Sequence, residues 1–287
     1  MKRLIALFPT ILLLLACSES LDGTDDPDLS PVVLNTGRLL SIDGSGMHIA
    51  YTYDEMGRII YAERFDTAWN VVKMIGQYTY DTDFIYITFQ EFAEKPNGDR
   101  DPDYSLDHVH YDTLFLENDR VDSVAGARQD GRNCFFYKFR YNERGELTYV
   151  RDDNVKRDRQ GKLADKPWYT EIILLDWQDG NVLRKSQINS RRPDTTAATY
   201  TYSSLTGNVI LSEPRNVLPD FEPLMQTGYF GKGCRNLFNG CETKATKERI
   251  EYQLDGQGMV CQMKSNVIWN DGITHDYTFA IKWVDGQ

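Results

Sequence analysis

Apolar and polar residues alternate with a period of two along most of the chain beyond residue 37. From 277 to 283, aromatic and aliphatic residues alternate with threonine, alanine and lysine, and residues 49–53 and 250–254 follow the same order. A period of two gives a β-strand one apolar and one polar face, as in an antiparallel sheet that is buried on one side. About fourteen to sixteen such runs occur, and sustained helical periodicity is nearly absent. The pattern predicts an all-β protein.

One sequence unit recurs, consisting of an aromatic strand, a polar turn with glycine and a second strand. The clearest copy, residues 51–61, reads YTYDEMGRIIY, and looser copies occupy 139–147, 175–182, 200–209 and 250–260. Glycine supplies the positive φ that such a turn needs, so each copy predicts a hairpin. Because the copies are unevenly spaced, we expect a long curved meander of unequal hairpins and no regular solenoid.

The segment from Ser212 to Lys247 interrupts this pattern. It holds three prolines and four glycines and shows no sustained alternation. An irregular segment of this length with many apolar residues is not expected to extend into solvent. We predict that it folds back onto the sheet and plugs an open end of a barrel or covers a concave apolar face.

The first residues resemble the leader of an exported lipoprotein. Met1 to Arg3 is basic and residues 4–15 are largely apolar, a run too short to cross a bilayer as a helix. The following LLAC resembles a bacterial lipobox, which implies cleavage after Ala16 and a diacylglycerol on Cys17. We therefore expect a signal peptide at 1–16, a disordered acidic tether at 17–35 and a single all-β domain at 36–287.

Localisation follows from the same residues. No later stretch is long and apolar enough to span a membrane, so attachment is expected through the lipid alone. Acidic residues soon after Cys17 resemble the export signal of surface lipoproteins in Bacteroidetes. They favour the cell surface over the periplasmic face of the outer membrane.

The whole chain resembles one family. The unit at 51–61 resembles the YD repeats of Rhs-type shells. With the lipobox and the segment GYFGKGCRNL at 228–237, the chain resembles a Bacteroidetes lipoprotein family of unknown function with a porin-like fold, over about residues 35 to 285. The resemblance implies an antiparallel sheet that closes partly or wholly into a barrel. Charged residues such as Lys138 and Glu251 lie opposite the aromatic face, which favours a soluble barrel over a membrane barrel.

Composition narrows the functional classes. Of 287 residues, 41% are hydrophobic and 12% aromatic, enough for one sizeable core, and the net charge is −11. An acidic chain without a long basic run argues against a nucleic-acid partner. Nucleophile, zinc-protease and phosphate-loop motifs are absent, and the many acids single out no pair for glycoside hydrolysis.

Candidate sites are few. Cys234 and Cys241 are the likeliest disulfide pair in an exported chain, while Cys134 and Cys261 occupy strand-like runs. Weak metal candidates are two histidines on one strand face and a run of acids that fails the EF-hand spacing; a wet sheet face and a solvated turn are the favoured alternatives. These residues are His108, His110, Asp99, Asp101 and Asp103.

Three loop-adjacent aromatics, Trp69, Trp168 and Tyr169, are candidates for ligand contact. We expect no cofactor. The sequence favours a lipid-anchored, non-enzymatic binding or structural protein of the cell envelope, with a glycan, lipid or protein as ligand. The alternatives are a carrier of a hydrophobic ligand and a glycan-acting hydrolase.

Overall fold

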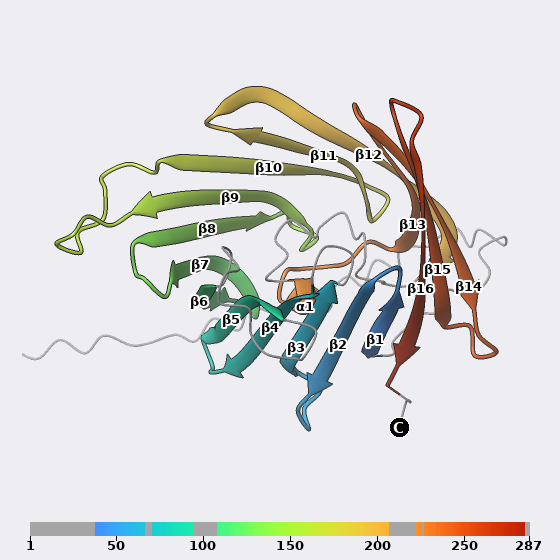
Figure 1. Cartoon of the computed structure of the whole chain (residues 1–287), viewed down its shortest axis with the longest axis horizontal. Coiled ribbons are helices and arrows are strands. Elements are labelled where there is room, and N and C mark those ends of the chain that lie inside the picture. Colours follow the sequence, from blue (N-terminus) through green and yellow to red (C-terminus); the bar gives the residue numbers. More distant parts are fainter. Residues whose placement is uncertain (1–37, 67–70, 95–107, 207–221, 226, 285–287) are drawn as a thin grey trace, which may run out of the picture. The chain divides into compact units, whose positions relative to one another are not determined.

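The computed structural model describes residues 38–66, 71–94, 108–206, 222–225 and 227–284. They form sixteen antiparallel strands and one short helix (Figure 1). The elements are β1 Leu39–Gly44, β2 Met47–Tyr53, β3 Ile59–Asp66, β4 Val71–Tyr80, β5 Phe84–Glu94, β6 His108–Glu117, β7 Arg120–Arg128, β8 Asn133–Tyr141, β9 Leu147–Lys156, β10 Tyr169–Gln178, β11 Asn181–Asn189, β12 Arg192–Thr206, α1 Glu222–Met225, β13 Asn236–Thr243, β14 Thr246–Leu254, β15 Val260–Trp269 and β16 Thr274–Trp283.

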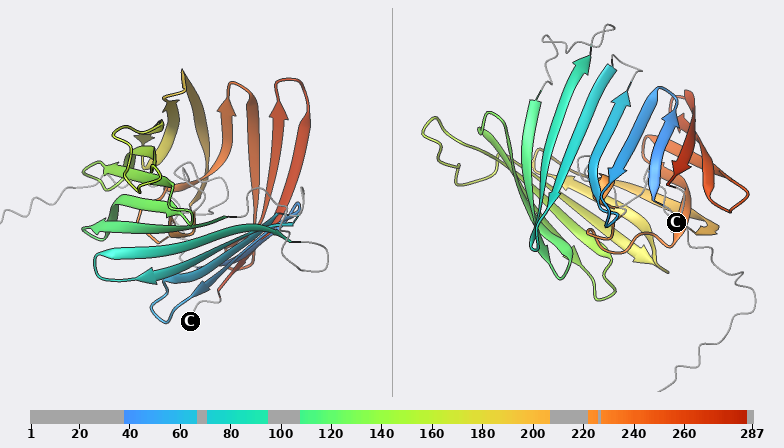
Figure 2. Two further views of the ribbon diagram at one scale, coloured as in Figure 1. Left: turned by 60° about the vertical axis from the view of Figure 1, so that its left-hand side comes forward. Right: turned by 90° about the horizontal axis from the view of Figure 1, so that it is seen from below.

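The sheet is a closed barrel. Each strand pairs with its neighbours in the chain, and β16 returns to pair with β1 (Figure 2). In this seam Ile42 lies opposite Ile281, and the backbone N–H of Val284 donates to the carbonyl of Arg38 at 2.8 Å. Closure leaves no free strand edge. The predicted curved meander is confirmed, and its closure is complete.

Three copies of the recurring sequence unit form the same turn, whereas the copy at 175–182 closes with a two-residue turn at Asp179 and Gly180, and residues 207–209 of the copy at 200–209 lie outside the described residues. At Asp54, the carboxylate accepts the N–H of Arg58 at 2.8 Å, and the Asp54 carbonyl accepts the N–H of Gly57, which has φ +81°. Asn142 and Asp255 repeat this arrangement with the glycines three residues on. A side-chain oxygen that accepts a later N–H stabilises a tight turn, so the repeats are hairpin ends.

The aromatic residue at the end of nearly every even-numbered strand donates a hydrogen bond to a backbone carbonyl near the start of the preceding strand. Tyr53 donates to Leu39 at 2.6 Å, and Trp177 to Leu147 at 2.7 Å. The other donors are Tyr80, Tyr141, Tyr202, Tyr252 and Trp283. These bonds tie each hairpin to the next, which explains why tyrosine and tryptophan recur before the turn.

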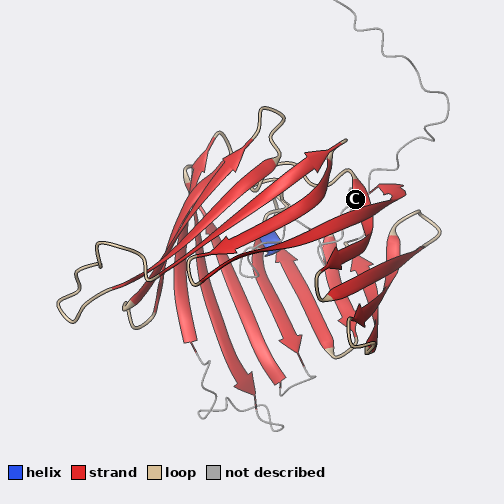
Figure 3. Ribbon diagram, turned by 90° about the horizontal axis from the view of Figure 1, so that it is seen from above, coloured by secondary structure: helices blue, strands red, loops and turns tan. Residues whose placement is uncertain are grey.

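The segment before β13 is the plug. Leu224, Met225 and Phe230 have 0–2% of their surface exposed and belong to the main apolar core. Figure 3 shows α1 surrounded by strands. Burial of each such side chain stabilises the fold by about 1.5–3 kcal/mol, so the prediction that this segment plugs the barrel is confirmed for its described part.

The predicted end of the irregular segment needs correction. Residues 236–243 form β13 and pair with β12, and β14 begins at Thr246. Gly240, which pairs with Arg249, obscures the alternation of β13 in the sequence. Residues 207–221 of the predicted segment lie outside the described residues.

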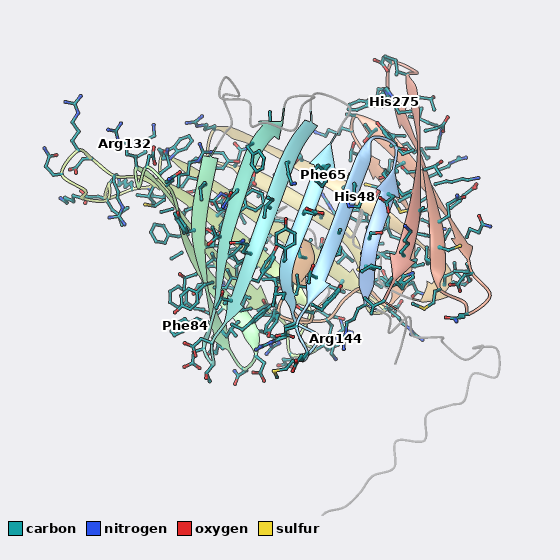
Figure 4. All side chains as sticks on the ribbon, turned by 60° about the horizontal axis from the view of Figure 1, so that its bottom comes forward. His48, Phe65, Phe84, Arg132, Arg144 and His275 are labelled. Carbon is teal, nitrogen blue, oxygen red and sulfur yellow. The ribbon has the colours of Figure 1, made fainter. Side chains whose placement is uncertain are left out.

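The plug crosses one end of the barrel, which we call the plugged end. The N–H of Val121 donates to the carbonyl of Tyr229 at 2.8 Å, that of Lys232 to Gly145 at 2.9 Å, and that of Arg235 to Gly180 at 2.9 Å. These contacts follow the hairpin turns β6–β7, β8–β9 and β10–β11. Figure 4 shows Arg144 at this end and Arg132 and His275 at the opposite end.

Candidate functional site

The inner wall changes character along the barrel axis. Near the plugged end, inward residues such as Val150 and Ile173 face each other across strands and are buried in the core. One step farther along the same strands, the inward pair is Asp152 and Glu171. Since alternate residues share a face, this part of the wall is polar.

Asp152 and Glu171 form a cross-strand carboxyl pair. The Asn154 amide donates to Asp152 at 2.8 Å, and Glu171 accepts from the Tyr169 hydroxyl at 2.8 Å and the Gln187 amide at 2.7 Å. Burial raises the pKa of Asp152 to about 7, and the nearby negative charge of Glu171 adds to that rise. Asp152 is therefore close to half-protonated near neutral pH and can donate or accept a proton.

A cavity of about 370 Å³ adjoins this pair on β11, β12 and β13. Gln187, which donates to Glu171, is one of its walls. The lining mixes ammonium, amide, hydroxyl and aromatic groups with small side chains. Its residues are Lys185, Gln187, Thr196, Ala197, Ala198, Tyr200, Cys241, Thr243, Lys244 and Ala245.

A second cavity, near the plug, is much smaller. It has a volume of about 40 Å³, and residues such as Ile49, Met74, Phe89 and Pro223 line it. This space is of the order of one to a few water molecules. The larger cavity is therefore the better candidate site.

His110 and Asp112 lie in the inner wall of β6, with the His110 Nε2 and Asp112 Oδ2 atoms 3.5 Å apart and both side chains buried. The His110 ring stacks on Phe89 with centroids 4.7 Å apart and meets the edge of Phe135 at 5.5 Å. Gly126 leaves room for this packing, because a Cβ there would lie 2.1 Å from Asp112 Oδ1.

The structure does not describe the side chains of the other four predicted metal ligands. Asp99, Asp101, Asp103 and the side chain of His108 lie outside the described residues. Within the described part of the chain, no group of three or more His, Cys, Asp or Glu side chains is placed to hold a metal ion.

Two of the three predicted ligand-contact aromatics, Trp168 and Tyr169, lie at the end of the barrel opposite the plug. Trp168 is 40% exposed, and the cations of Arg191 and Lys156 lie 4.3 and 5.1 Å from the centre of its ring. Tyr169 is half-buried and holds Glu171. Trp69 lies outside the described residues.

Among the described residues, Cys134, Cys234, Cys241 and Cys261 form no disulfide in this structure. The predicted Cys234–Cys241 disulfide is not formed in it. The Cys234 sulfur lies 3.7 Å from the Tyr202 hydroxyl, whereas Cys241 lines the large cavity. Burial, with the nearby charge of Glu248, raises the pKa of the Cys241 thiol to about 11, so it stays protonated at neutral pH.

Sequence reasoning missed Asp152, Glu171 and Lys185 as inner-wall residues. The sequence held one sign of them: a charged residue stands where the alternation of the strand calls for an apolar one. Asp152, two residues after the buried Val150, is an example. Many outward positions carry similar residues, so the sequence alone does not separate them.

Comparison with known proteins places the fold. The chain resembles the crystal structure of a porin-like protein from Bacteroides uniformis, with a TM-score of 0.58 and 14% identity over 86% of this chain and 98% of that one. It also resembles a porin-like protein from Bacteroides vulgatus, with a TM-score of 0.53 and 11% identity over 87% and 100%. No family model and no curated protein matches the sequence. The molecule thus has a porin-like, plugged sixteen-stranded barrel fold.

Proposed function

We propose that this protein is a lipid-anchored, non-enzymatic binding module of the cell envelope, and that it holds a polar small molecule in the inner wall of the barrel. The cavity on β11–β13, with its mixed polar lining, is the observation that carries the proposal. A pocket with a few convergent polar groups is the usual form of a small-molecule site. Leu224, Met225 and Phe230 of the plug belong to the apolar core near the other end of the barrel.

Charged side chains on the outer wall of the barrel support attachment to the membrane by a lipid and argue against insertion of the barrel into the bilayer. Lys247, Arg249, Glu251, Lys264 and Lys282 are all exposed on β14–β16. A charged side chain facing lipid costs up to about 2–4 kcal/mol at the bilayer midplane. No helix in the described ranges is long and apolar enough to cross a membrane.

The larger cavity combines apolar side chains with hydrogen-bonding groups, which favours a ligand that carries polar groups over a wholly apolar one. The cavity beside the plug has a volume of only about 40 Å³, and Glu63 and Arg64 are among its lining residues. A lipid tail would instead have to lie against Lys185, Gln187 and Thr243 in the larger cavity. Such a tail would form no hydrogen bond with the polar groups of the lining.

The binding proposal is tested by filling the cavity. Thr196→Trp places a bulky ring at the lining, while Thr199→Trp, an exposed residue on the opposite face of β12, is the matched control. Native mass spectrometry of gently purified protein should show a bound small molecule in the control and its loss in Thr196→Trp. Equal occupancy in both variants, or an empty control, would contradict the proposal.

Lipid attachment is tested separately. Cys17→Ser should abolish the diacylglycerol mass on the N-terminal peptide and release the protein from the membrane fraction. Protease treatment of whole cells reports surface exposure. Membrane retention of Cys17→Ser would contradict lipid anchoring.

Hydrolysis of a glycan is a second candidate function, favoured by the Asp152–Glu171 pair. Glycosidases use two carboxyl groups, one of them with a raised pKa, and burial raises that of Asp152 to about 7. Reducing-end release from polysaccharides that is lost in both Asp152→Asn and Glu171→Gln, in folded protein, would support it. Release that survives both changes would exclude this pair.

A further inference from the structure

The rim of the barrel opposite the plug carries positive charge in an acidic protein. The connection between β9 and β10 lies there and extends past the neighbouring hairpins (Figure 1). Five of the thirteen residues from Lys156 to Trp168 are basic and two are acidic, whereas the whole chain has 32 basic and 43 acidic residues. The β7–β8 turn adds Arg132, whose carbonyl accepts the N–H of Arg157 at 2.7 Å. This part of the rim therefore has a local excess of positive charge.

Trp168 holds two of these cations together. Its backbone N–H donates to the carbonyl of Asn154 at 3.0 Å, and the residue is 40% exposed. The guanidinium of Arg191, from the β11–β12 turn, and the ammonium of Lys156, from the end of β9, both lie over its ring. A cation–π contact attracts each cation to the ring. The ring thereby keeps two like charges close together, although they repel each other.

Neither of these two cations forms an ion pair among the described residues. The acids of the neighbouring wall accept hydrogen bonds from other groups. Asp153 accepts from the Arg151 side chain at 2.8 Å, and Glu171 accepts from Tyr169 at 2.8 Å and from Gln187 at 2.7 Å. An anion from outside therefore meets two exposed cations, forms charge-assisted hydrogen bonds with them and relieves their repulsion.

An exposed tryptophan beside cations fits a sugar chain that carries acid groups. An aromatic ring offers a flat apolar surface to the C–H face of a sugar, and a guanidinium binds a planar acid group through two parallel hydrogen bonds. Arg159, Lys162 and Lys166 are also exposed along the β9–β10 connection. Successive acid groups of a polymer would thus meet successive cations.

The position of the rim favours a soluble polymer over an anionic bilayer. Arg38, just before β1, lies beside Gly57 in the β2–β3 turn, and this turn is at the plugged end because successive turns of a meander alternate between the ends. Strands of about ten residues separate the two ends by about 30 Å. The segment that carries Cys17 therefore joins the barrel at the end away from the rim. This step of the reasoning rests on the proposed lipid attachment.

We propose that the rim cluster of Trp168, Lys156 and Arg191 binds an acidic polysaccharide. The acid groups of the polymer contact the two cations, and its sugar rings pack against the exposed part of the tryptophan. The rim cluster is a second site, since none of its three residues lines the cavity on β11–β13.

The test compares two polyanions with their neutral counterparts. Polygalacturonate and its methyl ester have the same sugar chain, as do dextran sulfate and dextran. Biolayer interferometry at pH 7 should show binding of a polyanion without binding of its neutral partner, and the binding should weaken as salt screens the charges.

Variants of the rim cluster locate the binding. Lys156→Gln and Arg191→Gln should each weaken it by about threefold to tenfold, as expected for the loss of one exposed charge-assisted contact. Trp168→Ala should weaken it at least as much, because the ring holds both cations. Thermal melting confirms that each variant is folded.

Two control variants match these changes. Arg184→Gln removes the same charge from an exposed residue on the outer face of β11. Trp269→Ala removes a tryptophan that is 45% exposed at the same end of the barrel and has no cation over its ring among the described residues. Both controls should bind the polyanion as the native protein does.

Each outcome decides the matter. Binding of either polyanion over its neutral partner that falls in the rim variants and persists in the controls supports the inference. Binding of neither polyanion, equal binding of charged and neutral chains, or equal losses in rim and control variants overturns it. Binding of phosphatidylglycerol vesicles through the same residues, without binding of either polysaccharide, would assign the rim to a membrane surface and also overturn it. The assay with Thr196→Trp is independent of these results, so their failure leaves the cavity proposal standing.

Discussion

At Gly231 the backbone of the plug packs closely against the barrel wall. The φ of Gly231 is +77°, and a Cβ built there would lie 2.4 Å from the carbonyl oxygen of Gly145 and 3.0 Å from the Tyr141 ring. The neighbouring Lys232 N–H donates to the same carbonyl at 2.9 Å. Gly231→Ala must therefore shift either the plug or the β8–β9 turn.

The expected loss has two parts. A non-glycine residue at positive φ costs about 1–2 kcal/mol. The overlap with Gly145 and Tyr141 costs about a further 1–3 kcal/mol, as for other overpacked sites. Gly228→Ala separates these parts, because Gly228 has φ +85° but nothing within 4 Å of its Cβ position.

Urea unfolding followed by tryptophan fluorescence measures both variants. We expect Gly231→Ala to lower the free energy of unfolding by about 1–3 kcal/mol more than Gly228→Ala does. Equal losses in the two variants would show that the plug does not press against the β8–β9 turn. The reasoning about the plugged end would then be wrong.

Three further changes test other parts of the barrel. Tyr252→Phe removes the hydrogen bond from Tyr252 to a β13 carbonyl and should lower the free energy of unfolding by about 1–3 kcal/mol. The control is Tyr111→Phe: Tyr111 is 52% exposed, and the change should alter the free energy of unfolding by under about 0.5 kcal/mol. Equal losses in the two variants would show that the Tyr252 hydrogen bond does not stabilise the barrel. Phe230→Ala empties a fully buried plug position and should cost about 3–5 kcal/mol in the same urea assay, whereas a loss below about 1 kcal/mol would contradict its burial. Because the pKa of Asp152 is raised from 3.8 to about 7 in the folded protein, the unfolded chain loses this proton first and stability falls as pH rises from about 4 to 7. Asp152→Asn should remove that fall, a gain of at most about 4 kcal/mol at pH 8 that shrinks toward pH 4; a gain that does not depend on pH, measured by melting across this range, would contradict the raised pKa.

Local chemistry made much of the fold predictable. The alternation at 250–254 and the turn beginning at Asp54 depend on neighbouring residues only, so strands and hairpins could be read directly. The burial of Phe230 followed from the apolar content of the segment around it. The boundary at Asn236 could not be read, because Gly240 conceals the alternation of β13 and only pairing with β12 defines that strand.

The candidate site could not be read in the same way. Asp152, Glu171 and Lys185 come from three strands and resemble many outward-facing residues in the sequence. Their inward direction depends on the register of each strand, since a shift by one residue would turn every side chain to the other face.

The sequence by itself determined an all-β chain of aromatic hairpins with an apolar plug, because period, turn residues and composition act over short distances. Only the tertiary structure decided that the sheet closes fully, that the plug follows one end of the barrel, and that two lysines meet at one cavity. Those features depend on register and on contacts between residues far apart in the chain, for which a single sequence carries no local signal.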